Sequence, residues 1–213
     1  MKRKNILVIN PNSNETVTEG LRKSLAGFAD DASIQCRTLT DGPFGIESDE
    51  DIARAASLVL AEVAAAATFD AFVIACYSDP GLAECHALHR VPVFGMQQSA
   101  VETAVSCGGK FGVLALSDVS IARHRSYIRK LGYADRLAME LALDISVDEA
   151  ANDSGTLDKV LLNGRRLVEE FGASSVILGC AGMAAIKEIA QKKLPVPVIE
   201  PAQAAVRLAI ESV

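Results

Sequence analysis

The chain carries one pattern twice, and this repeat restricts its possible folds more than any other feature. The apolar run FVIAC ends at Cys76 and the run VILGC ends at Cys180, so the two thiols lie 104 residues apart. The segments 91–105 and 196–210, which begin VPVFG and VPVIE, are identical at 7 of 15 positions. Short apolar runs that precede helix-forming segments are typical of βα units. The repeat therefore predicts two copies of one βα module related by approximate symmetry.

Short β-rich runs alternate along the chain with longer segments of helical period, which indicates a parallel sheet with crossover helices. We predict strands at 5–9, 33–38, 71–75, 93–95, 110–116, 136–141, 175–178 and 198–199. We predict helices at 16–29, 49–67, 81–88, 97–107, 121–131, 156–171, 183–192 and 202–213, with Asn14, Ser48 and Ser120 as caps. The acidic segment 143–154 is predicted to be mostly loop. The predicted fold class is α/β, with two pseudo-symmetric lobes that each hold a four-stranded, mainly parallel sheet flanked by helices.

The repeat also predicts where the lobes begin and end. We assign residues 1–98 to lobe one and 99–201 to lobe two. An alanine-rich helix follows each repeated VPV strand, and in a duplicated α/β protein such a helix can cross to the other lobe. The C-terminal helix at 202–213 is therefore predicted to complete lobe one. The carboxyl ends of both sheets would line the cleft between the lobes, where open α/β folds bind ligands, so we expect the active site there.

Composition and motifs exclude several classes of function. A formal net charge of −6 offers no basic stripe for nucleic acid. The apolar run at 6–9 is too short for a signal peptide. No apolar stretch approaches the roughly 20 residues of a membrane span. We therefore expect a cytoplasmic protein that acts on a small molecule. Five cysteines without a CxxC pair or zinc-ligand spacing predict no metal site. The absence of GxGxxG and P-loop motifs predicts no nucleotide cofactor.

Two of the five cysteines have the placement of catalytic groups. Cys76 and Cys180 each end a predicted buried strand just before a turn into a helix. Backbone N–H groups and the positive end of a helix would stabilise a thiolate there, and would lower its pKa below the free value of about 8.5. Cysteine is also a common core residue, but matched positions in a repeat favour paired acid/base groups on opposite faces of a substrate. Cys36, Cys85 and Cys107 have no such partner and are predicted to be core or surface filler.

Polar turns follow matching strands in the two halves. The first strand ends in the run NPNSN at 10–14, and Ser117 follows the corresponding strand of the second half. A helix cap explains such a turn without function, yet both turns lie at the carboxyl ends of strands and face the predicted cleft. From these turns and the cysteine motifs we predict substrate contacts by Asn10, Ser13, Tyr77, Ser78, Leu116, Ser117, Ala181 and Gly182.

Other polar residues receive less specific interpretations. His86, His89 and His124 fall within predicted helices, mostly beside charged residues, and we predict that all three are surface residues. Glu47 and Asp49 follow a turn that contains Gly and Pro. These two acids either close over the cleft from lobe one or begin a helix with negative charge in its first turn, and both interpretations are open.

Three motifs together resemble the aspartate/glutamate/hydantoin racemase superfamily, most of all its hydantoin and allantoin racemase branch. They are INPNSN at 9–14, IACYSDPGL at 74–82 and LGCAGM at 178–183, and the resemblance covers nearly the full chain. It implies a cofactor-independent racemase of a cyclic ureide, such as a 5-substituted hydantoin or allantoin, and a homo-oligomer. It also implies that Cys76 and Cys180 are the two bases. One thiolate removes the proton of the stereocentre while the other group, as a thiol, returns a proton from the opposite face.

Departures from this resemblance keep alternative functions open. Ala115 and Leu116 stand where that branch usually has threonines, and Tyr77 replaces an aromatic-plus-acidic pair after the first cysteine. A maleate-type cis–trans isomerase and an aspartate or glutamate racemase remain alternatives within the superfamily, whereas a related decarboxylase keeps only one of the two cysteines. A non-catalytic, two-lobed protein that binds a small ligand is the alternative from another class.

Overall fold

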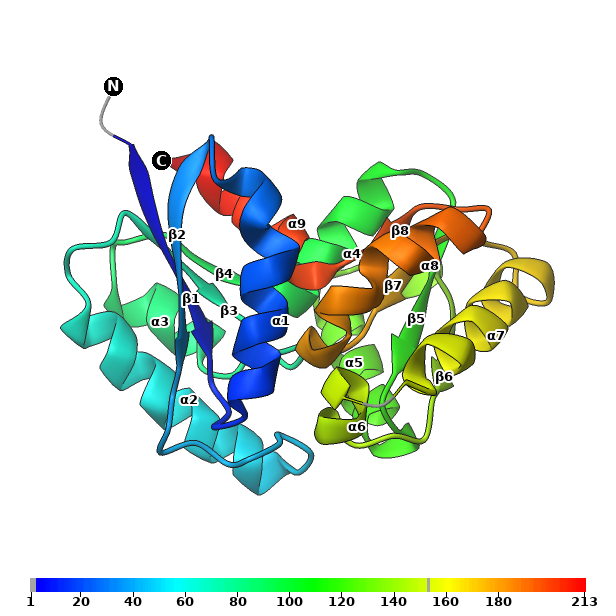
Figure 1. Cartoon of the computed structure of the whole chain (residues 1–213), viewed down its shortest axis with the longest axis horizontal. Coiled ribbons are helices and arrows are strands. Elements are labelled where there is room, and N and C mark those ends of the chain that lie inside the picture. Colours follow the sequence, from blue (N-terminus) through cyan, green and yellow to red (C-terminus); the bar gives the residue numbers. More distant parts are fainter. Residues whose placement is uncertain (1–2, 153) are drawn as a thin grey trace.

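Two parallel sheets of four strands form the centre of the protein (Figure 1). The computed structural model describes residues 3–152 and 154–213, so Met1, Lys2 and Asp153, which belong to the N-terminal run and the predicted acidic loop, lie outside the described residues. Sheet one has the order β2-β1-β3-β4 and sheet two the order β6-β5-β7-β8. Each adjacent pair of these strands is parallel. The strands are β1 (Lys4–Asn10), β2 (Ala32–Thr38), β3 (Ala71–Ile74), β4 (Val93–Gly95), β5 (Lys110–Ala115), β6 (Leu137–Ala142), β7 (Ala173–Leu178) and β8 (Val198–Ile199).

The matching strand orders confirm the α/β fold and the repeat read from the sequence. β1 and β5 are the second strands of their sheets. β3 lies beside β1 and β7 lies beside β5, so equivalent strands of the repeat occupy equivalent positions in the two sheets. The α-helices are α1 (Glu15–Leu25), α2 (Asp49–Ala65), α3 (Leu82–Leu88), α4 (Met96–Ser106), α5 (Asp118–Lys130), α6 (Val147–Asn152), α7 (Thr156–Glu169), α8 (Lys187–Lys193) and α9 (Pro201–Ser212). No helix within the described residues is long and apolar enough to cross a membrane.

Continuous apolar runs form the inner strands because helices cover both faces of each sheet. Ile6, Leu7, Val8 and Ile9 of β1 are all fully buried, and the four residues of β3 are buried as well. A parallel strand that is buried on both faces has such an unbroken apolar run rather than alternation. These buried strands fix the positions of the turns at their carboxyl ends, where the two cysteines follow.

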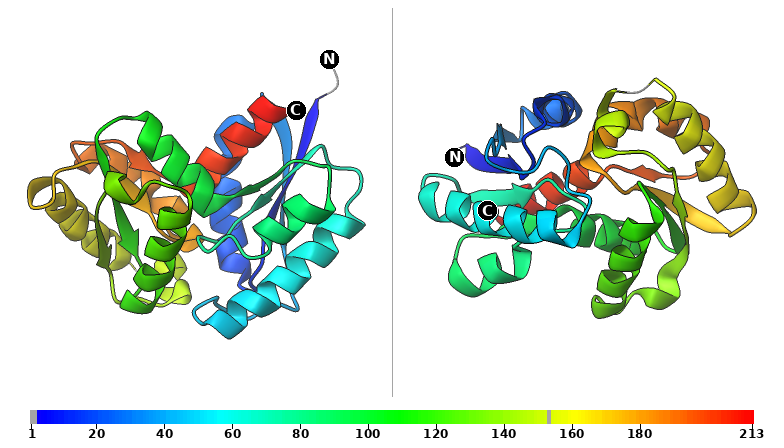
Figure 2. Two further views of the ribbon diagram at one scale, coloured as in Figure 1. Left: turned by 180° about the vertical axis from the view of Figure 1, so that it is seen from behind. Right: turned by 90° about the horizontal axis from the view of Figure 1, so that it is seen from below.

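Helices α4 and α9 pack against each other where the two sheets meet (Figure 2). α4 follows β4 of sheet one but contacts β5, β7 and β8 of sheet two, whereas α9 follows β8 of sheet two and contacts β1, β3 and β4 of sheet one. The C-terminal end of α9 is tied to sheet one, since the Nζ of Lys4 donates to the carbonyl of Ile210. Each helix thus crosses to the opposite sheet, although the lobe boundaries at 98/99 and 201/202 remain a prediction.

Local capping explains where the structure departs from the predicted elements. Asn14 and Ser48 cap α1 and α2 as predicted. Ser120 does not cap α5, because the Ser117 side chain accepts from the N–H of Ser120 and the helix begins three residues earlier than predicted. The segment 143–154 also contains helix α6, because Ser146 and Glu149 hydrogen-bond to each other's backbone N–H in a capping box. The predicted helix at 183–192 is a 3₁₀ helix, η3 (Ala181–Ile186), followed by α8.

Asp79 ties the turn after Cys76 to the beginning of α4. Its carboxylate accepts the backbone N–H groups of Gln97 and Gln98, both at 2.9 Å, and its side chain lies against Gly95. Asp79 also has a φ of 44°, in the left-handed region that non-glycine residues seldom occupy. The turn that carries Cys76 is therefore held in place by the N-terminus of a helix that packs on the other sheet.

Replacing Gly95 with alanine is expected to destabilise the fold by about 1–3 kcal/mol. A Cβ at this position would lie 2.3 Å from the Asp79 carboxylate, which cannot move away without losing its two N–H donors. Urea unfolding measures the change. The matched control is Gly20→Ala in α1, where a Cβ meets nothing within 4 Å, and this change is expected to stabilise the protein by up to about 1 kcal/mol. Equal stability of Gly95→Ala and wild type would contradict the close packing.

Candidate active site

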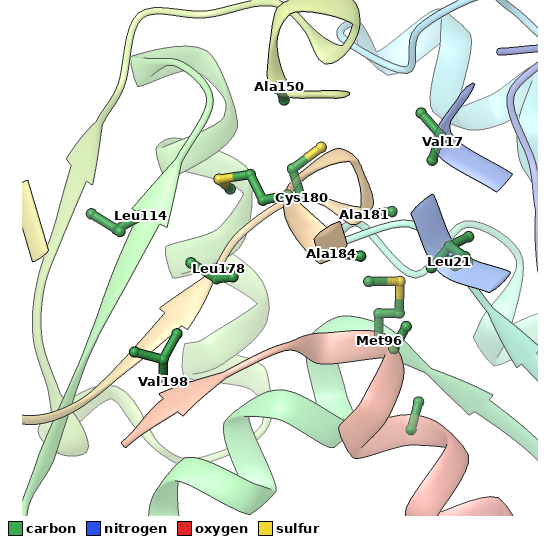
Figure 3. Packing of buried hydrophobic residues seen from close by; sticks show 14 of the residues in the cluster. Val17, Leu21, Met96, Leu114, Ala150, Leu178, Cys180, Ala181, Ala184 and Val198 are labelled. Carbon is green, nitrogen blue, oxygen red and sulfur yellow. The ribbon is translucent and has the colours of Figure 1, made fainter. Parts of the chain in front are cut away.

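The two cysteines of the repeat line one cavity between the sheets. Cys76 comes two residues after the end of β3, and Cys180 comes two residues after the end of β7. Neither forms a disulfide, and together they line a cavity with about 450 Å³ of empty space, part of it open to solvent. Figure 3 shows Cys180 between Val17 and Leu21 of α1 on one side and Leu114 of β5 on the other. Equivalent strand ends thus bring the predicted pair to one site from two different sheets.

The ionisation of the two thiols differs from the sequence-based prediction. Burial raises the pKa of Cys76 to about 12 and that of Cys180 to about 11. The predicted donors are present, since the N–H of Ser78 lowers the pKa of Cys76 and the N–H of Gly182 donates to Cys180 Sγ at 3.3 Å. Loss of hydration outweighs these donors, so the prediction of pKa values below 8.5 was wrong. Both groups are therefore thiols at neutral pH.

The two cysteines also interact with each other. Negative charge on Cys180 further raises the pKa of Cys76, because two like charges in one poorly hydrated cavity repel. The pair therefore does not ionise twice. Once one proton has left, the cavity holds one thiolate and one thiol, which are a base and an acid on the two sides of the same space.

Five of the eight predicted substrate contacts line the cavity: Tyr77, Ser78, Leu116, Ala181 and Gly182. The other three, Asn10, Ser13 and Ser117, are not among its lining residues. Asn10 is fully buried, and its side-chain amide donates to Asn12, to the carbonyl of Asn14 and to Thr18, so it orders the polar turn from within. Asn12 is the residue of this turn that lines the cavity. Which of these residues touch a substrate remains a prediction.

The cavity also includes residues that the sequence reasoning missed. The first half of the chain contributes Asn12, Val17 and Ile46, and the second half contributes Ser120, Arg123, His124 and Val147. Ser120, Arg123 and His124 are spaced i, i+3 and i+4 on α5, which places them on one face of the helix. This spacing was a usable signal, and it was missed because α5 was predicted to begin only after Ser120.

His124 is not a surface residue, so the prediction for this histidine was wrong. It is 2% exposed, its Nδ1 lies 3.2 Å from a carboxylate oxygen of Glu140 on β6, and its ring meets that of Tyr77 edge to face at 4.8 Å. Of the charged neighbours that suggested a solvated face, Arg123 lines the cavity together with His124, and the guanidinium of Arg125 lies 3.5 Å from the other oxygen of the Glu140 carboxylate. His86 is exposed as predicted, and His89 is partly exposed.

Both interpretations of the acidic pair after the Gly-Pro turn find support in the structure. Asp49 begins α2 and belongs to its acidic first turn. Glu47 contacts the second half of the chain, because its carboxylate accepts the N–H of Val147 at the start of α6, at 3.0 Å. The guanidinium of Arg123 donates to the carbonyl of Glu47 at 3.4 Å. The chain around Ile46, which lines the cavity, is therefore fastened to elements of the second half.

Arg123 supplies positive charge to the cavity wall. Its guanidinium lies 3.6 Å from the carboxylate of Asp49, and its Nε is buried without a hydrogen-bond partner in the described part of the chain. This charge lowers the pKa of Cys76, against the larger effect of burial. Among residues 3–152 and 154–213 there is no group of three or more His, Cys, Asp or Glu side chains placed to hold a metal ion. The chemistry available here is proton transfer beside cationic and N–H donors.

Comparisons with known proteins find relatives that match nearly the whole chain. The chain matches the Asp/Glu/hydantoin racemase family over residues 6–209. It is 32% identical to a hydantoin racemase of Rhizobium meliloti over 208 residues, which are 96% of this chain and 86% of that protein. It is also 32% identical to a hydantoin racemase of Paenarthrobacter aurescens over 209 residues, 96% of this chain and 89% of that protein.

A solved structure extends the similarity to three dimensions. Allantoin racemase from Klebsiella pneumoniae superimposes with a TM-score of 0.88 at 30% identity, and the match covers 98% of this chain and 86% of that one. The family match over residues 6–209 spans both strand ends that carry the cysteines. On this evidence the chain belongs to the Asp/Glu/hydantoin racemase family.

Proposed function

We propose that this protein is a cofactor-independent racemase of a cyclic ureide, a 5-substituted hydantoin or allantoin. Its similarity to hydantoin racemases and to an allantoin racemase over nearly the whole chain supports the reaction class. The single observation that carries the mechanism is the placement of Cys76 and Cys180 at equivalent strand ends, on the wall of one cavity.

The proposed reaction is a proton exchange at the ring carbon beside a carbonyl group. The thiolate of one cysteine takes the proton of this carbon, so that a C–H bond breaks, an S–H bond forms and the electron pair moves onto the carbonyl oxygen as an enolate. The thiol of the other cysteine then gives its proton to the opposite face of the planar carbon. The two cysteines exchange roles with the enantiomer that is bound. The pair carries one proton before and after the reaction and two protons while the enolate exists.

The remaining wall of the cavity suits a small ring that is polar at its edges. Side chains of Asn12, Ser78 and Ser120 and backbone groups around Cys180 offer hydrogen-bonding partners for the carbonyl and N–H groups of a ureide. Apolar side chains, among them Val17 and Ile46, limit the access of water. Where these side chains exclude water, donors stabilise an enolate more strongly than they would in water.

The test is proton NMR of the purified protein in D₂O, with allantoin, a panel of 5-substituted hydantoins, aspartate, glutamate and maleate, followed alongside optical rotation. We expect the stereocentre signal and the rotation of one cyclic ureide to disappear together. Exchange on aspartate or glutamate, or a fumarate signal from maleate, would replace the proposal by one of the alternatives of the superfamily. If a ureide binds and no substrate changes, the protein is a binder and the proposed reaction is wrong.

Glu47→Ala is expected to raise the KM of the ureide about tenfold, because the charged acceptor that holds Ile46 over the cavity against α6 is lost. Steady-state kinetics measures the change. Glu47→Gln keeps an oxygen that can accept from Val147 and should change KM less. Glu50→Ala, in the exposed first turn of α2, is the control for charge alone. An unchanged KM in Glu47→Ala would show that this contact does not hold the substrate in.

A homo-oligomeric state and a cytoplasmic location also belong to the proposal, and both come from the resemblance to the family and from the expectations of the sequence. Sedimentation velocity of the purified protein tests the first. A monomer at micromolar concentration would contradict it.

A further inference from the structure

The proposed proton transfer leaves part of the cavity wall without a role beyond excluding water. Val17, Ile46, Leu116 and Val147 all line the cavity, and each is at most 9% exposed. They come from α1, from the turn before α2, from the segment between β5 and α5, and from the start of α6. Branched apolar side chains from distant parts of the chain therefore meet at the site of the two thiols.

These side chains are continuous with one of the two reacting groups. Val17, Leu116 and Val147 belong to a single contact cluster of buried residues that also contains Cys180. Figure 3 shows Cys180 with Val17 of α1 and Ala150 of α6 on the side toward which its sulfur points. A molecule that brings its reacting carbon to Cys180 therefore brings the substituent on that carbon to this cluster.

Ile46 is held against the same cluster from the first half of the chain. The residue before it, Gly45, packs directly on Val147, since a Cβ at Gly45 would lie 3.2 Å from the Cβ of Val147 and 3.4 Å from its Cγ2. The carboxylate of Glu47, the residue after Ile46, accepts the backbone N–H of Val147 at 3.0 Å. Ile46 thus has a contact to Val147 on each side of it in the chain, and the apolar part of the wall has a defined shape.

The charged and aromatic groups of the wall form a second part. Arg123 and His124 lie on α5, and the ring of Tyr77 meets that of His124 edge to face at 4.8 Å. Tyr77 belongs to a different contact cluster from Val17. The two parts meet where the guanidinium of Arg123 donates to the carbonyl of Glu47 at 3.4 Å. The cavity thus divides into an apolar part and a part rich in hydrogen-bonding groups.

A 5-substituted hydantoin has the same division. Its ring carries carbonyl and N–H groups along its edges, whereas the substituent leaves the ring at the reacting carbon, which both thiols must reach. Beside Cys180 this substituent meets side chains that neither donate nor accept hydrogen bonds. An alkyl group is stabilised by burial there, but the ureido group of allantoin would lose its hydrogen bonds to water without replacement.

We propose that Val17, Ile46, Leu116 and Val147 form the subsite for the 5-substituent, and that the substrate is a hydantoin with an aliphatic side chain rather than allantoin. The inference rests on the proposed function and narrows its substrate class. The four side chains determine specificity and take no part in proton transfer, so the proton balance of the two thiols is unchanged.

The first test compares 5-isobutylhydantoin with allantoin. The isobutyl and ureido groups have the same number of non-hydrogen atoms and the same branched shape, so the two substrates differ mainly in the polarity of the substituent. Polarimetry gives kcat/KM for each, and division by the rate constant of uncatalysed racemisation corrects for the different acidity of the two ring carbons. We expect the corrected value to be about 10²-fold or more higher for 5-isobutylhydantoin. Along the series 5-methyl-, 5-ethyl- and 5-propylhydantoin, kcat/KM should rise about fourfold for each methylene group.

Two variants test whether these side chains make the selection. Val147→Thr puts a hydroxyl into a side chain of the same shape and keeps the backbone N–H that Glu47 accepts. We expect kcat/KM for 5-isobutylhydantoin to fall about tenfold in this variant, while the value for allantoin stays the same or rises. Leu116→Ala enlarges the subsite, so preference should move from 5-isobutylhydantoin to the larger 5-benzylhydantoin. The matched control is Leu162→Ala on α7, where the side chain is 63% exposed and does not line the cavity, and the preferences should not change.

Specific results would overturn the inference. A corrected kcat/KM that is higher for allantoin, or variants that change all substrates by one common factor, would show that these side chains do not hold the substituent. If Leu116→Ala does not fold, the ratio of the two substrates in Val147→Thr decides the question alone. Failure of the proposed function is distinguishable, because a protein that racemises no ureide contradicts that function, whereas a protein that racemises only allantoin supports it and overturns this inference.

Discussion

Serine in place of either Cys76 or Cys180 is expected to lower racemisation of the ureide by about 10³-fold or more. Each thiol is the base for one enantiomer and the acid for the other, so the full reaction needs both. A hydroxyl has nearly the size of a thiol but is a far weaker acid, so the variants should fold and still lack the proton-transfer group. Polarimetry of each enantiomer measures the loss.

Half of the reaction should survive in each single variant. The remaining thiol can still remove the proton of the enantiomer whose hydrogen faces it, and can return deuterium from D₂O to the same face. We expect NMR to show slow loss of the stereocentre proton without loss of rotation, for one enantiomer in Cys76→Ser and for the other in Cys180→Ser. The double variant should lose exchange with both, and its loss of racemisation should be smaller than the product of the single losses, since the two groups act as a unit.

The other cysteines provide matched controls for this experiment. Cys85→Ser replaces a buried thiol in α3, and Cys107→Ser replaces an exposed thiol at the end of α4, and neither residue lines the cavity. Both variants should racemise at close to the wild-type rate. Near wild-type racemisation in Cys76→Ser or Cys180→Ser would contradict the two-base mechanism. If racemisation falls by as much in Cys107→Ser, the replacement of a thiol lowers activity because it disturbs the fold.

The repeat was sufficient to predict both sheets because the inner strands are buried on both faces. Such strands have unbroken apolar runs, and in a parallel sheet all carboxyl ends lie at one edge, so an equivalent residue after each run comes to an equivalent place. This reasoning predicted that Cys76 and Cys180 lie at one site, without any knowledge of the loops. It predicts where strands end, and each cysteine comes two residues after a strand end.

Side chains beyond the strand ends were harder to predict, because their direction depends on caps and on neighbours distant in sequence. Asn10 and Asn12 are alike in the sequence, yet Asn10 turns inward to hold the turn and Asn12 lines the cavity. His124 looked like a surface residue because its partner, Glu140, lies on a different element. Only the observed start of α5 places Ser120, Arg123 and His124 on one face toward the cavity.

The thiol pKa values could not be predicted for a related reason. The turns after β3 and β7 supply the expected N–H donors, and these do lower the pKa of each cysteine. How far burial raises the pKa depends on every element packed around the cavity, which no local motif encodes. The cavity therefore has the arrangement of a two-base site in which both thiols are protonated at neutral pH.

In the absence of ligand, alkylation of Cys76 and Cys180 by iodoacetamide is expected to accelerate about tenfold for each unit of pH from 7 to 10. The thiolate is the reactive form. With pKa values of about 12 and about 11, the thiolate fraction keeps rising tenfold per unit throughout this range. A small free thiol with a pKa of about 8.5 instead levels off near pH 9 and is the reference for the reagent. Mass spectrometry of the digested protein assigns the rate to each cysteine.

The change of the alkylation rate with pH decides between two explanations of how the enzyme obtains its thiolate base. If the rates at both sites level off below pH 8, the turns stabilise a resting thiolate as the sequence motif suggested, and the burial argument is wrong. If they keep rising to pH 10, the resting pair is neutral and the thiolate forms only with substrate bound. In that case kcat/KM should also rise with pH above 7. A resting thiol is also protected from oxidation, because the thiolate is the form that oxidants attack.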